Sequence, residues 1–195
     1  MTTREALALI VPHLRDEVRI HANGFLSRAA CAARDTDTCF YMIGSMGLAS
    51  SIGLGIAIAQ PRRRIVVFDG DGNVLMNPGA LARIAAAAPK NFVHLCFDNG
   101  VHASTGGQRT IADRVGLDAL ARAAGYRFVE RVDTLDALAA MMPAVARRDG
   151  PGFLHLRITP GPAGAPGPRI PHTPQEMTAR LRGALGGTPQ GTLGR

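Results

Sequence analysis

The sequence has no tryptophan and a single lysine, Lys90, so the other 21 of its 22 basic residues are arginines. They give a net charge of +7, but they are scattered along a chain in which aromatic residues make up only 5%. Nucleic-acid-binding proteins usually gather their basic residues on one face or stripe. We therefore expect no nucleic-acid partner and attribute the charge to an anionic small-molecule substrate or an acidic partner subunit.

Long apolar runs and paired cysteines are also missing. The most apolar stretch, residues 52–59, is interrupted by glycines and ends at Gln60, which is too short for a membrane span. Acidic residues lie among the apolar ones near the N-terminus, so this segment does not resemble a signal peptide. The three cysteines are odd in number and lack metal-ligand spacing. We therefore expect free thiols in a cytoplasmic protein without membrane contact.

Segments with strand and helix patterns alternate along the chain. Residues 64–68 are almost wholly apolar, as is typical of a strand buried on both faces of a parallel sheet. The alternation predicts an α/β fold, a doubly wound and mostly parallel sheet with helices on both faces. The expected strands are 18–21, 39–43, 64–68, 92–97, 126–131 and 153–158, and the expected helices are 3–16, 25–34, 47–59, 78–88, 113–124, 134–147 and 175–185.

A segment rich in proline and glycine, PGPAGAPGPRIPHTP, interrupts this alternation near the C-terminus. Such a composition does not build a packed core of its own and is typical of a linker. We therefore predict one α/β domain over residues 1–159, a linker over 160–174, and a C-terminal helix with a flexible tail over 175–195.

Three glycine-bearing loops follow expected strands: GSMG at 44–47, DGDGN at 69–73 and DNGVHASTGG at 98–107. In open parallel sheets, ligands bind outside the carboxyl ends of the strands. Glycines let the backbone approach a ligand, and the start of a helix after each loop favours a negatively charged group. The sequence therefore predicts a site for an anionic ligand at this end of the sheet.

Asp71 and Asn99 are the metal-ligand candidates within these loops. They follow strands that we expect to be adjacent, and 26 residues separate Gly72 from Asn99. A carboxylate and an amide oxygen suit Mg²⁺, which usually takes further ligands from phosphates and water. A GDG or an NG sequence alone is weak evidence for such a site. The two together, each after an expected strand, indicate a site for a metal and a phosphate group.

With this spacing, the chain resembles the diphosphate-binding half of thiamine diphosphate enzymes. It is similar in particular to the beta subunit of two-subunit sulfopyruvate decarboxylases and to phosphonopyruvate decarboxylases. The stretches that carry the resemblance are YMIGSMGLASSIGLGIA, VVFDGDGNVLMNPGALA, DNGVHASTGGQRT and RIPHTPQEM. Asp98 departs from the pattern, because many members of the family have an asparagine there. The resemblance implies thiamine diphosphate and Mg²⁺ as cofactors.

The resemblance also implies roles for individual residues. Asp71, the Asn99 side chain and the Val101 carbonyl would bind the metal. Met46 would lie between the two cofactor rings, and the Gly44 carbonyl would accept a hydrogen bond from the aminopyrimidine. The complete set implied to bind the cofactor is Gly44, Ser45, Met46, Gly70, Gly72, Asn73 and Asn23.

The substrate side of the expected site lies in the loop after Asn99. His102 is either a catalytic residue, acting in substrate binding or proton transfer, or a hydrogen-bonding residue of the loop. Ser104, Thr105 and Arg109 are candidates for contact with an anionic substrate. The resemblance implies decarboxylation of 3-phosphonopyruvate or 3-sulfopyruvate to an aldehyde and carbon dioxide.

One required group is missing from the sequence. Enzymes of this family are activated by a glutamate on a pyrimidine-binding domain, and none of the chain's four glutamates lies in a suitable loop. We therefore expect a hetero-oligomer in which an alpha-type subunit supplies that domain and glutamate. Two alternatives are a carboligase subunit similar to acetolactate synthase and a non-catalytic subunit that binds the cofactor for regulation.

Overall fold

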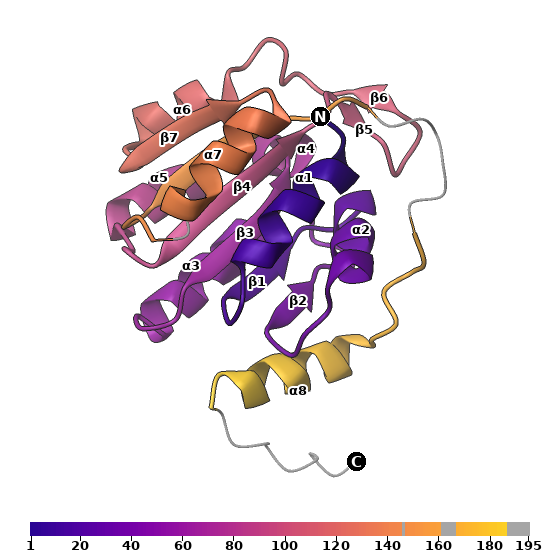
Figure 1. Ribbon diagram of the computed structural model, residues 1–195, viewed down its shortest axis with the longest axis vertical. Helices are drawn as coiled ribbons and strands as arrows, with labels where there is room; N and C mark the ends of the chain where they lie inside the picture. Colours follow the sequence, from indigo (N-terminus) through magenta and orange to yellow (C-terminus); the bar gives the residue numbers. More distant parts are fainter. Residues whose placement is uncertain (146, 161–166, 187–195) are drawn as a thin grey trace.

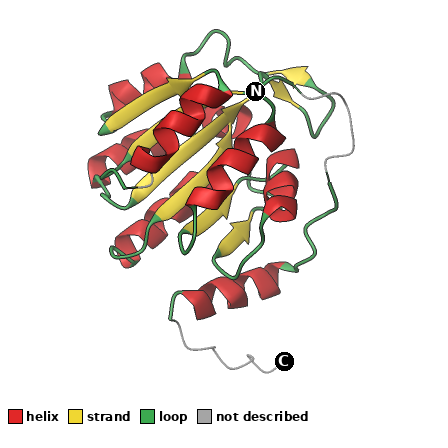
Figure 2. Cartoon of the chain, in the orientation of Figure 1, coloured by secondary structure: helices red, strands yellow, loops and turns green. Residues whose placement is uncertain are grey.

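A six-stranded parallel sheet with helices on both faces forms the body of the protein (Figures 1 and 2). The computed structural model describes residues 1–145, 147–160 and 167–186. All five pairs of neighbouring strands in this sheet are parallel. Their order is β2 (Cys39–Tyr41), β1 (Val18–His21), β3 (Ile65–Gly70), β4 (Phe92–Asp98), β8 (Gly152–Arg157) and β7 (Phe128–Val132). The predicted doubly wound α/β fold is confirmed.

Both faces of the sheet are buried, which explains the apolar run in β3. Val66 and Phe68 pack into the core on one face, and Ile65 and Val67 pack into the core on the other. Successive side chains of a strand point to opposite faces, so a strand covered on both sides is apolar at every position.

Two helical layers supply these cores. Helices α1 (Thr3–Ile10), α2 (Phe25–Ala33) and α7 (Leu135–Val145) contribute to one core, and α3 (Ala49–Ala59), α5 (Gly79–Ala87) and α6 (Leu117–Ala124) contribute to the other. Helix α3 packs closely on the sheet, since a Cβ on Gly53 would lie 2.5 Å from Val67 Cγ2. Within the described residues, no helix combines the length and the apolar character that crossing a bilayer requires.

The order of the strands creates a switch point beside β1. The chain runs from β1 outward to β2 and then returns to β3 on the opposite side of β1. The connections on the two sides of such a point lead away from each other and leave a crevice at the carboxyl ends of the strands. The ends of β1 and β3 therefore form the expected place for a ligand.

Two short elements near this point differ from the prediction. The prediction of a glycine loop after the third strand is wrong, because helix α4 (Asp71–Met76) begins directly after β3. Val74 anchors α4 in the core, and this packing outweighs the low helix propensity of glycine. In the loop after β4, β5 (Val101–His102) and β6 (Gln108–Arg109) form a small antiparallel pair that was not predicted.

The bounds of several other elements also differ from the prediction. The helix expected over 3–16 ends at Ile10 and continues as the 3-10 turn Val11–His13, which contains Pro12. The strand expected over 39–43 ends at Tyr41. The helix expected over 113–124 begins at Leu117, and the strand expected over 126–131 spans Phe128–Val132.

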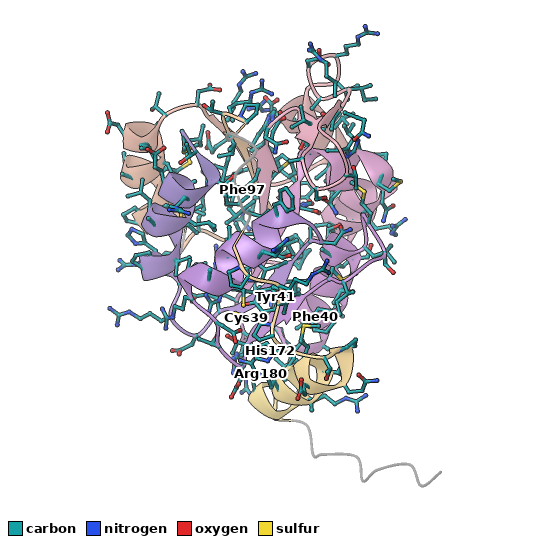
Figure 3. All side chains as sticks on the ribbon, turned by 90° about the vertical axis from the view of Figure 1, so that its right-hand side faces the viewer. Cys39, Phe40, Tyr41, Phe97, His172 and Arg180 are labelled. Atoms are coloured by element: carbon teal, nitrogen blue, oxygen red, sulfur yellow. The ribbon has the colours of Figure 1, made fainter. Side chains whose placement is uncertain are left out.

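The C-terminal helix α8 (Pro174–Ala184) lies against β2 at the edge of the sheet (Figure 1). Figure 3 shows His172 and Arg180 beside Tyr41 and Cys39. Asp35 joins these groups, because it accepts hydrogen bonds from Tyr41 Oη at 3.0 Å, His172 Nε2 at 2.6 Å and Arg180 at 3.0 Å. Residues 161–166 of the predicted linker and 187–195 of the predicted tail lie outside the described residues.

Candidate functional site

The predicted ligand residues gather at one end of the sheet. Asn23 follows β1 by two residues, Asp71 directly follows β3, and Asn99 directly follows β4. The strands are in register there, since His21 lies opposite Phe68 and Gly70 opposite Phe97. The three side chains therefore start from the adjacent ends of three neighbouring strands, as the sequence predicts.

Asp71 is a buried carboxylate, with 3% of its surface exposed. Burial raises the pKa of the Asp71 carboxyl above its usual value, because the charged form loses hydration. A hydrogen bond from Thr110 opposes this change, whereas the nearby charge of Asp98 adds to it. A buried carboxylate with a raised pKa needs a compensating charge, and a cation would supply it.

Asn99 and Asp98 have different surroundings. The Asn99 side-chain oxygen accepts a hydrogen bond from the Val101 amide at 3.0 Å, which shapes the turn into β5. Asp98 is held by His155 at 2.7 Å and by Arg157. Burial opposes ionisation of Asp98, but these two partners outweigh it and lower its pKa. Asp98 thus stabilises the turn that carries Asn99.

The oxygen-rich donor set fits Mg²⁺ better than a softer metal. Within residues 1–145, 147–160 and 167–186, no group of three or more histidine, cysteine, aspartate or glutamate side chains could hold a metal ion. Asp71, the Asn99 amide and the Val101 carbonyl together offer one carboxylate and two neutral oxygens. Mg²⁺ is commonly held in this way, by one or two carboxylates with phosphate and water completing its shell.

Gly72 lies between Met46 and His102, two residues that come from different loops. A Cβ on Gly72 would lie 2.6 Å from His102 Cε1 and 3.0 Å from Met46 Cε. No side chain larger than hydrogen fits there without displacing one of the two. The structure thus brings together Gly72 and Met46, for which the resemblance implies cofactor binding, and His102, the candidate catalytic residue.

Asn73 and Asn23 form a direct contact at the switch point. Asn73 Nδ2 donates a hydrogen bond of 2.7 Å to Asn23 Oδ1. The Asn73 side chain also lies beside Gly70, where a Cβ would be 3.1 Å from Asn73 Oδ1. Because Asp71, Gly72 and Asn73 form the first turn of α4, their backbone N–H groups lack partners within the helix and can receive an anion.

The GSMG turn is more exposed than the rest of the predicted site. Gly44 and Ser45 are exposed, and Met46 is half-buried. Ser45 has a φ of 52°, a left-handed conformation that is uncommon for a residue other than glycine. Strained backbone of this kind often occurs where a ligand is bound, which agrees with the role predicted for this turn.

The substrate candidates occupy different positions in the β5–β6 loop. A Cβ on Gly24 would lie 3.5 Å from Ser104 Oγ, so Ser104 reaches the end of β1. Thr105 Oγ1 is hydrogen-bonded within the loop, to the His102 carbonyl at 3.3 Å. Arg109 is exposed and forms an ion pair of 2.8 Å with Asp113. Of the three substrate candidates, Ser104 is the one that lies beside the end of β1.

Thr110 is the residue that the sequence analysis missed. It is 7% exposed, and its Oγ1 donates a hydrogen bond of 2.5 Å to Asp71 Oδ2. The two residues are 39 positions apart, so no local pattern joins them. The signal in the sequence that could have indicated Thr110 is a hydroxyl-bearing residue at the end of the loop that carries the expected metal ligand Val101.

Two other polar residues near the site, Asp69 and His21, are buried in the packing around it. Asp69, the first carboxylate of DGDGN, is buried and hydrogen-bonded to His94 Nε2 at 3.1 Å. His21 is 1% exposed and lies between the rings of Tyr41 and Phe68, with centroid distances of 4.8 and 4.5 Å. Burial lowers the pKa of His21 to about 3, and the charge of Arg19 contributes to this shift.

Comparison with known proteins gives the same assignment. The family model described as the thiamine pyrophosphate enzyme, C-terminal TPP binding domain, matches residues 24–156. A phosphonopyruvate decarboxylase of Streptomyces viridochromogenes is 45% identical over 179 residues, covering 91% of this chain and 44% of the relative. The sulfopyruvate decarboxylase subunit beta of Methanothermobacter thermautotrophicus is 44% identical over 162 residues, covering 83% of this chain and 84% of the relative.

Solved structures agree at the level of the fold. The thiamine diphosphate-dependent 4-hydroxybenzoylformate decarboxylase of Rhodococcus jostii aligns with a TM-score of 0.69 at 17% identity, covering 82% of this chain and 33% of that chain. The chain also spans less than half the length of the phosphonopyruvate decarboxylases it matches. The family match and the geometry together show that the chain belongs to the thiamine pyrophosphate enzymes, as a domain of their C-terminal, cofactor-binding type.

Proposed function

We propose that the chain is the diphosphate-binding subunit of a thiamine diphosphate-dependent decarboxylase of short 2-oxo acids. The observation that carries the proposal is the convergence of a buried carboxylate, Asp71, with Asn73 and Asn23 at the switch point of the sheet. The phosphonopyruvate decarboxylase and the sulfopyruvate decarboxylase subunit compared above each match more than four fifths of this chain, which supports the same class of reaction.

Asp71, the Asn99 side chain and the Val101 carbonyl would hold Mg²⁺ in this site. The N–H groups of Gly72 and Asn73 would face the diphosphate, because they lie in the first turn of α4. When bound, thiamine diphosphate supplies the electron sink that decarboxylation of a 2-oxo acid requires. The remaining predicted cofactor contacts come from the GSMG turn and from the ends of β1 and β3: Gly44, Ser45, Met46, Asn23 and Gly70.

The substrate we propose is 3-phosphonopyruvate or 3-sulfopyruvate. His102 lies against the Gly72 backbone, where it would contact the substrate next to the cofactor. Ser104 and Thr105 belong to the same loop and would line the substrate side of the site. Arg109 would bind the second anionic group after leaving its exposed ion pair with Asp113, which costs little because such pairs contribute at most about 1 kcal/mol.

An alpha-type partner subunit is needed to complete the site. The chain's four glutamates lie elsewhere: Glu5 and Glu176 cap helices, Glu130 pairs with Arg148, and Glu17 precedes β1 at the opposite end of the sheet. The activating glutamate must therefore come from another chain or domain.

Large exposed apolar side chains border the candidate site, and we propose that they form part of the surface that meets the partner. Ile43 and Leu48 flank the GSMG turn, and Met76 ends α4. Gly47 joins these two segments, since a Cβ on it would lie 3.2 Å from Met76 Cβ. A cytoplasmic location is also part of the proposal, supported by the three cysteines, which are all free thiols.

Assay of the chain with and without an alpha-type partner tests the proposal. The pair should release carbon dioxide and one equivalent of aldehyde from one of the two acids, in the presence of thiamine diphosphate and Mg²⁺. A coupled hydroxyketone would instead indicate a carboligase such as an acetolactate synthase. Cofactor binding without turnover of any 2-oxo acid would indicate the non-catalytic, regulatory alternative, and turnover by this chain alone would contradict the need for a partner.

A further inference from the structure

The segment between β4 and α6 is closed on itself at its two ends. The Thr110 amide donates to the Gly100 carbonyl at 2.9 Å, and β5 pairs with β6 just inside this contact. The enclosed loop carries Val101 and His102, one an expected metal ligand and the other the expected catalytic residue. Thr110 therefore fixes the end of this loop, and the positions of Val101 and His102 depend on that end staying in place.

The Thr110 hydroxyl extends from this closure to the metal carboxylate. Its Oγ1 lies 2.5 Å from Asp71 Oδ2 and also accepts a hydrogen bond from the Ala112 amide at 3.4 Å. Because an amide can only donate, the hydroxyl accepts from Ala112 and its own proton is directed to Asp71. Asp71 is thus the acceptor in the contact, a role suited to its ionised form.

We infer that Thr110 is a positioning residue for the metal site, which orients the Asp71 carboxylate and couples it to the loop of Val101 and His102. The inference rests on the proposed Mg²⁺-dependent cofactor site. Hydrogen-bonded partners of this kind hold a metal ligand in one orientation, and their loss typically weakens metal binding by about 10- to 100-fold.

The test uses Thr110→Val, which keeps the shape of the side chain and removes the hydroxyl, and Thr110→Ser, which keeps the hydroxyl. Each variant is assembled with the alpha-type partner, and thiamine diphosphate binding is titrated with Mg²⁺ by isothermal calorimetry. Thr178→Val is the matched control, because Thr178 is exposed on α8 and its hydroxyl bonds only to the Pro174 carbonyl among the residues the structure describes.

We expect Thr110→Val to raise the half-saturating Mg²⁺ concentration at least about tenfold, while saturating Mg²⁺ restores cofactor binding. Thr110→Ser and Thr178→Val should stay within about twofold of the wild type, because both keep the hydrogen bond to Asp71. A role limited to folding would lower the unfolding temperature of the metal-free protein without changing the Mg²⁺ requirement.

Two results would overturn the inference: an unchanged Mg²⁺ requirement in Thr110→Val, or an equal rise in Thr110→Ser. Thr110→Ala is a second hydroxyl-free variant, with the same expected rise, should Thr110→Val fail to assemble. Failure of the proposed function is distinguishable from these results, because the wild type itself would then show no Mg²⁺-dependent cofactor binding.

Discussion

Asn73 and Asn23 are joined by a side-chain hydrogen bond of 2.7 Å although 50 positions separate them in the sequence. The bond connects the first turn of α4 to the segment just after β1, across the switch point of the sheet. The two helices that diverge from this point, α2 and α4, are thereby held at a defined distance. A ligand bound between them would meet a preformed site.

The first prediction concerns this bond. Asn73→Ala leaves the Asn23 side chain without its donor, so the free energy of unfolding should fall by about 1 kcal/mol. Cofactor affinity should fall as well. Measuring Asn73→Ala, Asn23→Ala and the double variant by denaturant unfolding and calorimetry gives the coupling. Strictly additive effects would show that the two residues act independently.

The second prediction separates stability from binding at Asp71. The pKa of Asp71 is raised in the folded protein. The metal-free protein therefore loses stability as pH rises above the pKa that Asp71 has in the unfolded chain, because the folded state holds the ionised carboxylate less well. Asp71→Asn removes that charge and keeps an oxygen that can accept from Thr110. We expect a higher unfolding temperature without metal at pH 7, together with loss of Mg²⁺-dependent thiamine diphosphate binding in the assembled complex. Wild-type cofactor affinity in this variant would refute the metal assignment.

The third prediction concerns the contact around Gly72. Gly72→Ala introduces a Cβ that collides with His102 and Met46, so cofactor affinity should fall at least about tenfold. Gly55→Ala is the matched control, because a Cβ at Gly55 in α3 meets nothing within 4 Å. That change should stabilise the protein by about 0.5–1 kcal/mol. Equal effects of the two substitutions would argue against a specific contact at Gly72.

The fourth prediction concerns pH and His21. The pKa of His21 is lowered from 6.5 to about 3, so between these values the unfolded chain binds a proton that the folded protein excludes. His21 therefore removes stability as pH falls below about 6.5. His21→Phe keeps a ring between Tyr41 and Phe68. Its unfolding temperature should exceed that of the wild type increasingly from pH 7 to pH 4, and a constant difference would contradict the prediction.

Much of the fold and the core of the site could be predicted because they depend on local patterns. The apolar run of β3 and the glycine-bearing turns identify the parallel sheet and place Asp71 and Asn99 at its carboxyl end. The resemblance to thiamine diphosphate enzymes then assigned roles to these positions, which the family match supports at the level of the cofactor.

The features that could not be predicted depend on contacts between distant parts of the chain. Helix α4 contains glycine and asparagine, and it forms because Val74 is buried in the core. The Thr110 contact with Asp71 joins the end of the β5–β6 loop to the first turn of α4, and the two become neighbours only when β3 and β4 pair. No periodicity in the sequence records either contact.

The position of α8 has a consequence for the chain outside its assembly. β2 ends the sheet, and an uncovered edge strand can pair with a strand of another molecule. Met177 of α8 packs on Cys39 and Tyr41 of β2. Asp35, which is hydrogen-bonded to Tyr41, also forms ion pairs with His172 before α8 and Arg180 within it. We therefore expect a chain cut after residue 160 to lose this contact and to self-associate through β2.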